Sequence, residues 1–196
     1  MVLKIRQVGE QVLRQKARAL SRDEILDRST QELIESMRDT MHDAPGVGLA
    51  APQVGYPLQL VVIEDQAEFI QKLPPEQAAE RERKPVPFHV LINPKLIRPS
   101  SEEVEFFEGC LSLAGFTAIV PRARQVRVEG LNERAEAVTI DAEGWYARIL
   151  QHEIDHLGGV LYVDRMNSRS LCTHDNYARY WKDQTIAEVT SPEKLG

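Results

Sequence analysis

Residues 145–157 constrain the fold more than any other stretch of the chain. They contain no Gly or Pro, and their apolar residues recur at intervals of three and four, a spacing that predicts a helix. Within it, His152 and His156 lie one helical turn apart, so their imidazoles can point to one place. Glu153 follows His152, where it can touch a water on a metal ion without binding the ion itself.

Two imidazoles beside a carboxylate base are what metal-assisted hydrolysis requires. A pair of helix histidines with a surface glutamate remains the alternative, because a short motif can arise by chance. Catalytic metal sites usually have three protein ligands and leave a fourth position open to water. The rest of the chain must therefore supply a third ligand.

Cys110 is the best donor for this third position, because it follows Gly109 in a turn and its thiolate is a soft metal ligand. His174 lies in a weakly patterned region, and no well-spaced Glu or His follows His156. Two other interpretations stay open: Cys110 as a core residue of the turn, or in a single disulfide with Cys172. Two cysteines are too few for a disulfide framework and indicate a reducing compartment.

Length and charge limit the remaining possibilities. A chain of 196 residues suits one domain, and we expect a single catalytic domain over 1–170, an exposed insertion near 64–87 and a C-terminal tail over 171–196. The net charge of −6 offers no basic excess for nucleic acid. No apolar run reaches membrane-spanning length, and no leader sequence is recognisable. We expect the bacterial cytoplasm, or an organelle if a leader was removed.

Apolar periodicity and turn residues predict the other elements. A short helical signal covers 9–18, and a longer helix starts at Ser21 or Asp23 and ends at Pro45-Gly46. The insertion has one short helix near 75–83, and residues 165–196 are expected to fray. His89 alternates with apolar neighbours and is expected to have a hydrogen-bond partner or to face solvent. Strands are predicted at 58–63, 88–94, 103–107, 117–121, 125–130, 137–140 and 160–163.

The segment 46–53 combines two glycines with a glutamine. The glycines permit positive φ and the close approach of another group. A phosphate-binding loop is disfavoured because no Lys-Ser/Thr follows, and a tight turn that enters a strand is the plain alternative. Gln53 is notable, because its neutral side-chain amide could stabilise an oxyanion.

Together, segments 46–53, 108–112 and 151–157 resemble the three signature motifs of the peptide deformylase family, in order and without departure. The resemblance covers roughly residues 3–170. It implies an α+β fold with antiparallel sheets packed around a central metal-binding helix. It also implies removal of the N-formyl group from formyl-methionine of nascent polypeptides, with release of formate. The expected partners are N-formylmethionyl nascent peptides and, transiently, the ribosome, without direct recognition of nucleic acid or a membrane.

The resemblance also assigns roles to the motif residues. It implies Fe²⁺ at Cys110, His152 and His156, with Zn²⁺, Ni²⁺ or Co²⁺ able to substitute, because ligand softness alone does not select iron. Glu153 would take a proton as metal-bound water attacks the formyl carbon. The Gln53 side chain and the Leu111 backbone N–H would stabilise the oxyanion.

The substrate-binding residues are predicted from the motifs and from helix spacing. Trp145 and Ile149 share the helix face of His152, although such a stripe can equally be core, and Gly48 lets a peptide pair as an added strand. Arg122 and Asp155 are expected to form a buried pair. The complete predicted set is Val47, Gly48, Glu108, Gly109, Trp145, Arg148 and Ile149.

Two other functions fit parts of this pattern. One is a different metal hydrolase that shares only the helix motif, and Cys110 as a ligand distinguishes it. The other is a metal-carrying module that binds formylated chains without hydrolysing them. Glu153 argues against the second alternative, because a module that only binds needs no base.

Overall fold

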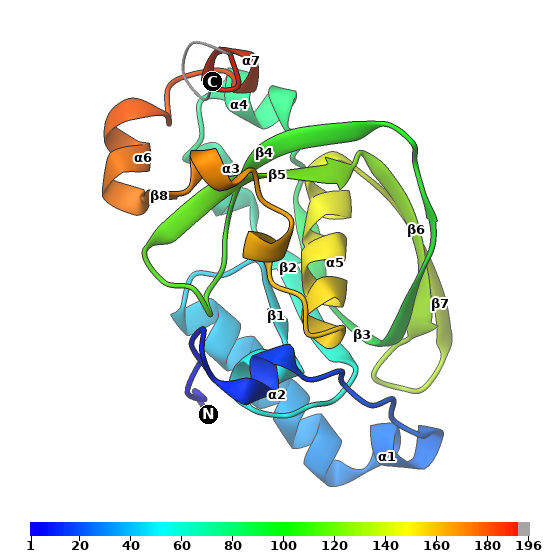
Figure 1. Ribbon diagram of the computed structural model, residues 1–196. Helices are drawn as coiled ribbons and strands as arrows, with labels where there is room; N and C mark the ends of the chain where they lie inside the picture. The colour runs from blue at the N-terminus through cyan, green and yellow to red at the C-terminus, as the bar shows by residue number, and fades with distance from the viewer. Residues whose placement is uncertain (192–196) are drawn as a thin grey trace.

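The structure, a computed structural model, describes residues 1–191. In Figure 1, helix α5 lies at the centre of the molecule with strands around it. The helices are α1 (Arg22–Leu26), α2 (Arg28–Asp43), α3 (Ala67–Gln71), α4 (Pro75–Glu80), α5 (Gly144–Leu157), α6 (His174–Tyr180) and α7 (Ile186–Val189). The strands are β1 (Gly48–Ala50), β2 (Leu60–Asp65), β3 (Val86–Pro99), β4 (Glu103–Gly109), β5 (Phe116–Ala123), β6 (Gln125–Leu131), β7 (Ala137–Glu143) and β8 (Cys172–Thr173). Short 3-10 turns cover Gln11–Arg14, Ala51–Val54, Tyr162–Asp164 and Ser168–Ser170.

The strands form two antiparallel sheets. The larger has the order β1-β2-β3-β6-β7, and the smaller has the order β4-β5-β8. Strand β1 is therefore an edge strand that, within residues 1–191, pairs with β2 alone, and Gly48 lies opposite Ile63. In the smaller sheet Gly109 pairs with Thr117, which places Cys110 directly after β4. The predicted α+β class with antiparallel sheets around a central helix is confirmed.

Helix α5 begins and ends at glycines. Gly144 has φ of +58°, and a Cβ there would lie 2.5 Å from the Cβ of Glu82, so the turn from β7 into the helix needs glycine. After Leu157, Gly159 has φ of +74°, and a Cβ there would lie 2.6 Å from the carbonyl oxygen of Arg14. The helix predicted for 145–157 is thus confirmed. Residues from other parts of the chain pack closely against the glycines at both of its ends.

Both faces of strand β2 in the larger sheet are buried. Val61 and Ile63 of β2 pack in a cluster with Leu150 of α5. The alternate residues Leu60 and Val62 belong to a second cluster with α2, in which Met37 and Met41 are fully buried. Because side chains alternate along a strand, β2 separates α5 from α2. The central helix is therefore held against a sheet that is itself supported from behind.

Two predicted elements differ in detail. The long helix is interrupted at Asp27, whose side chain accepts a hydrogen bond from Ser29 N at 2.8 Å and starts α2 as a separate helix. The strand predicted at 160–163 is wrong. Leu161 N donates to Asp164 Oδ2 at 2.8 Å, and this bond closes a 3-10 turn with Tyr162 buried inside it.

The chain after residue 165 was expected to fray, and for its described part this prediction is wrong. Strand β8 pairs with β5, and α6 and α7 follow. Figure 1 shows this end beside α4 of the insertion, and the rings of Phe107 and Tyr177 lie 4.8 Å apart. Residues 192–196 of the predicted tail lie outside the described residues. No helix in the described chain is both long and apolar enough to cross a membrane.

The insertion carries two short helices, α3 and α4, where one was predicted, and neither contains a buried residue. Arg83 joins it to the core, because its guanidinium donates to Asp65 at 2.7 and 2.9 Å and Asp65 is fully buried. His89 has the partners that were expected. Its Nδ1 lies 2.9 Å from Pro87 O, and its Nε2 lies 2.9 Å from the Tyr146 hydroxyl.

Candidate metal centre

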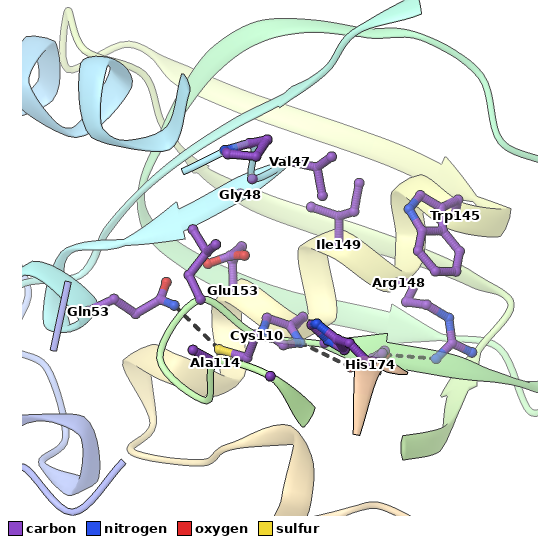
Figure 2. Close-up of a pocket in the computed structure, with 17 residues that line it drawn as sticks. Val47, Gly48, Gln53, Cys110, Ala114, Trp145, Arg148, Ile149, Glu153 and His174 are labelled. Atoms are coloured by element: carbon purple, nitrogen blue, oxygen red, sulfur yellow. Dashed lines mark hydrogen bonds and ion pairs between the residues drawn. The ribbon is translucent and has the colours of Figure 1, made fainter. Parts of the chain in front are cut away.

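Cys110, His152 and His156 meet beside a cavity. One ligand atom from each lies within 4.8 Å of the other two, and Sγ of Cys110 is 3.3 Å from Nε2 of His156. The two histidines project from α5. Cys110, labelled in Figure 2, comes from the turn after β4. Burial lowers the pKa of His156 well below its usual value, which keeps its imidazole neutral, as a metal ligand must be.

The donor set fits a divalent transition-metal ion. One thiolate and two imidazoles are ligands that zinc, iron, cobalt and nickel all accept. Nδ1 of His152 is 3.0 Å from Oε2 of Glu108, so this nitrogen donates to the carboxylate and leaves Nε2 for an ion. The site therefore has a fixed tautomer at one histidine and three donors that converge.

Glu108 is buried in a cluster of charges, with a residue exposure of 5%. It accepts from Arg122 Nε at 2.9 Å, from Arg148 Nη1 at 2.7 Å and from His152. Burial alone would raise the pKa of Glu108, but the hydrogen bonds from His152 and Arg122 hold it well below the usual range. Glu108 lines the cavity as predicted, yet both its carboxylate oxygens are already engaged within the chain.

The guanidinium groups around Glu108 connect strands β4 and β5 to α5 through hydrogen bonds. Arg148 also donates to Val120 O at 2.8 Å and to Val104 O at 2.6 Å, and burial lowers its pKa to about 10. Arg122 also donates to Asp155, so the predicted pair is present. Because an unpaired buried charge is costly, loss of one member would leave the others uncompensated.

Glu153 lies against the edge strand β1. A Cβ on Gly48 would come within 2.4 Å of Oε1 of Glu153, so the carboxylate occupies space that only glycine leaves free. Oε2 of Glu153 has no hydrogen-bond partner among the described residues, and the side chain lines the cavity. Burial raises the pKa of Glu153 to about 7, where a carboxyl can both accept and return a proton near neutrality.

Gln53 and Leu111 lie close to Cys110. Oε1 of Gln53 accepts from Ala50 N at 2.8 Å, and this bond turns Nε2 towards Cys110, 3.5 Å from its Sγ (Figure 2). Nε2 is also 3.3 Å from Ser112 Oγ. The Leu111 carbonyl accepts from Gln7 Nε2 at 3.0 Å, while its N–H makes no hydrogen bond within residues 1–191. Both groups therefore offer N–H donors near Cys110.

The cavity has a volume of about 520 Å³. His156 lies behind its wall, 1% exposed. The other predicted site residues all line it: Val47, Gly48, Gln53, Glu108, Gly109, Cys110, Leu111, Trp145, Arg148, Ile149, His152 and Glu153. Five further residues line the cavity and were not predicted: Pro45, Gly46, Ala114, Gly115 and His174. Gly46 lies within the segment 46–53, and Pro45, Ala114 and Gly115 lie close to the motifs, so these four could have been inferred. Nothing in the local sequence singles out His174 as a wall residue.

Comparison with known proteins decides the family, because the family model described as polypeptide deformylase matches residues 2–171. The chain belongs to the polypeptide deformylase family. It is 46% identical over 168 residues to peptide deformylase 1A, chloroplastic, of Solanum lycopersicum, and this match covers 86% of this chain and 61% of that deformylase. It is 40% identical over 195 residues to peptide deformylase 1 of Bifidobacterium longum, and this match covers 100% of this chain and 86% of that deformylase.

Solved deformylases also share the fold. A class I type b peptide deformylase from Acinetobacter baumannii, in a crystal structure described as bound to Met-Ala-Ser, matches with a TM-score of 0.76 and 32% identity. The match covers 85% of this chain and 99% of that deformylase. The chain spans only 61–66% of the length of three curated deformylases that it matches. The resemblance inferred from the three motifs is thus confirmed for family and fold.

Proposed function

We propose that the chain is a hydrolase that removes the N-formyl group from formyl-methionine of nascent polypeptides and releases formate. The observation that carries this proposal is the convergence of Cys110, His152 and His156 next to a buried Glu153 with a free carboxylate oxygen. Family membership supplies the reaction class, and the geometry is suited to hydrolysis of an amide-like bond.

Cys110, His152 and His156 hold the metal ion in this proposal. A divalent ion bound there would polarise the formyl oxygen and lower the pKa of a water molecule towards neutrality. We propose Fe²⁺ as the native ion, with Zn²⁺, Ni²⁺ or Co²⁺ able to replace it, since all of them accept this donor set.

Glu153 acts as the base and then as the acid. Its Oε2 accepts a proton from the attacking water, and the carboxyl returns a proton to the leaving amine. As the formyl oxygen gains negative charge, Nε2 of Gln53 and the N–H of Leu111 donate hydrogen bonds to it. The bond from Ala50 N to Gln53 Oε1 keeps that amide in the orientation needed for donation.

The substrate lies along the cavity. The methionine side chain packs between Val47, Trp145 and Ile149, which form the apolar wall beside the centre (Figure 2). Gly48 and Gly109 lie at the ends of two strands and leave room for the peptide main chain to pair with an edge. In this arrangement Glu108 and Arg148 support the wall and orient His152.

Formate release from formyl-Met-Ala-Ser tests the proposal, measured without oxygen on iron-loaded protein and repeated with nickel. We expect formate from the formyl peptide and no acetate from the corresponding N-acetyl peptide. A Cys110→Ala variant should lose both metal and activity. If that variant kept its metal and cleaved peptides, a different metal hydrolase would be the better description, and if metal-loaded wild type released no formate the proposal would be wrong.

The place of action belongs to the same proposal. Matched relatives include bacterial proteins and proteins described as chloroplastic, so we propose the bacterial cytoplasm or an organelle, where formylated chains are made. There the substrate emerges from the ribosome, and we propose that the encounter with it is transient.

A further inference from the structure

His174 lies on the cavity although it comes from the C-terminal part of the chain. It is the first residue of α6 and lines the cavity from beyond residue 171, where the family match ends. A Cβ built on Gly109 would lie 3.5 Å from Nε2 of His174, and Gly109 directly precedes Cys110. The imidazole therefore reaches the wall next to the candidate metal centre.

The backbone around His174 is held in place from several directions. Its N–H donates to Gly115 O at 3.0 Å, and the preceding Thr173 pairs with Phe116. One turn further along α6, the ring of Tyr177 contacts Phe107 of β4 at 4.8 Å, and its hydroxyl lies 3.4 Å from Arg81 Nη2. The imidazole thus projects from a fixed point rather than from a loose end.

The cavity has a buried depth and an exposed rim. Ile149 and Arg148 are 4% and 2% exposed in the depth. The exposed lining residues are Pro45, Gly109, Ala114, Gly115 and His174. Of these, only His174 has a polar side chain, and its imidazole makes no hydrogen bond to another residue of the described chain. The glycine and alanine residues around His174 present backbone atoms and leave open space beside its imidazole.

We propose that His174 binds the main chain of the substrate peptide just after the formyl-methionine, an inference that rests on the proposed function. With the methionine side chain in the buried depth, the following residues must leave across the rim. There the imidazole N–H donates a hydrogen bond to a peptide carbonyl oxygen. Because the contact is to main chain, it acts on substrates whatever their second side chain.

The test compares a substrate that crosses the rim with one that does not. For formyl-Met-Ala-Ser and formyl-methionine amide, we expect wild type to have a lower KM for the tripeptide. His174→Ala should reduce this preference about fivefold, the value of one hydrogen bond, with kcat for the tripeptide unchanged. His174→Asn, which keeps a donor, should restore much of the preference. Formyl-Met-Lys-Ser and formyl-Met-Asp-Ser should show the same loss as formyl-Met-Ala-Ser.

Asn176→Ala is the matched control, because Asn176 is exposed on the same helix and does not line the cavity. It should leave the KM ratio as in wild type. The inference is overturned if His174→Ala keeps the wild-type ratio, or if only the acidic peptide is affected. If wild type releases formate from neither substrate, the proposed function itself fails. Calorimetry with the product Met-Ala-Ser gives a second measurement, and it should show weaker binding to His174→Ala than to the control.

Discussion

Nδ1 of His152 lies 3.0 Å from Oε2 of Glu108, and this contact links the candidate metal centre to a cluster of buried charges. Glu108 is in turn held by Arg122 and Arg148, which are each 2–3% exposed. The orientation of His152, a proposed metal ligand, therefore depends on an ion cluster that spans both β4–β5 and α5. Loss of such support should affect both metal affinity and stability.

Replacement of Glu108 should weaken both. Glu108→Gln keeps the shape but leaves the buried Arg148 without a carboxylate and Arg122 with Asp155 alone, and we expect a loss of about 3 kcal/mol in the free energy of unfolding. Metal affinity should fall about tenfold to hundredfold. Urea unfolding and metal retention against a competing chelator measure these effects. Glu105→Gln, on an exposed position of the same strand, is the control. Metal retention equal to wild type would contradict the orienting role.

Glu153→Gln should separate chemistry from metal binding. The amide keeps the volume of the side chain but can no longer accept the proton, so kcat should fall by about 10²–10⁴. Metal content should stay near one ion per chain, as measured by elemental analysis after gel filtration. His152→Ala, by comparison, should lose the ion. Loss of metal from Glu153→Gln would mean that Glu153 acts as a ligand rather than as a base.

Gly48→Ala should lower activity through Glu153. The added Cβ would lie 2.4 Å from Oε1 and 2.8 Å from Cδ of Glu153, so the carboxylate must move away from its position. We expect kcat to fall about tenfold to hundredfold, the usual effect of a misplaced catalytic group. In a Glu153→Gln background the same substitution should cost little more, because the group that it displaces no longer acts. Additive losses would show that Gly48 acts by another route.

The stability of the fold should depend on pH through His89. Burial lowers the pKa of His89, and its neutral ring donates to Pro87 O and accepts from the Tyr146 hydroxyl. As the pH falls through about 6.5, the unfolded chain gains a proton that the folded chain does not yet bind, so the free energy of unfolding decreases. His89→Gln should flatten this decrease between pH 7 and pH 5. Urea unfolding curves of wild type and variant that shift in parallel with pH would exclude this contribution.

The parts of the site that the sequence reveals are those set by local pattern. His152 and His156 are related by helical spacing alone, and α5 follows from periodicity with glycines beyond its end. Cys110 and Gln53 are predicted from their donor chemistry and match the family motifs, and the structure places Cys110 beside His156 and Gln53 beside Cys110. In each case, short-range geometry or a contiguous motif carries the information.

What the sequence does not reveal depends on distant partners. Helix α6 has seven residues, too short to be stable alone, and the contact of Tyr177 with Phe107 of β4 holds it in place. Leu161 and Tyr162 belong to an apolar run that predicts a strand, but no partner strand is present in residues 1–191 and Asp164 closes a turn instead. Glu108 matches a pocket position of the family, while its two arginine partners follow only from the pairing of β4, β5 and α5.

The four hydrogen bonds that Glu108 accepts come from the chain itself, so the ring of His152 is oriented before any cation arrives. Most of the ordering entropy of that ligand is thus lost in folding and not on metal uptake. A metal site preorganised in this way differs from those of small zinc domains, which unfold without their ion. The protein should therefore stay folded when its ion is removed, and the apo form should then bind one divalent cation or another.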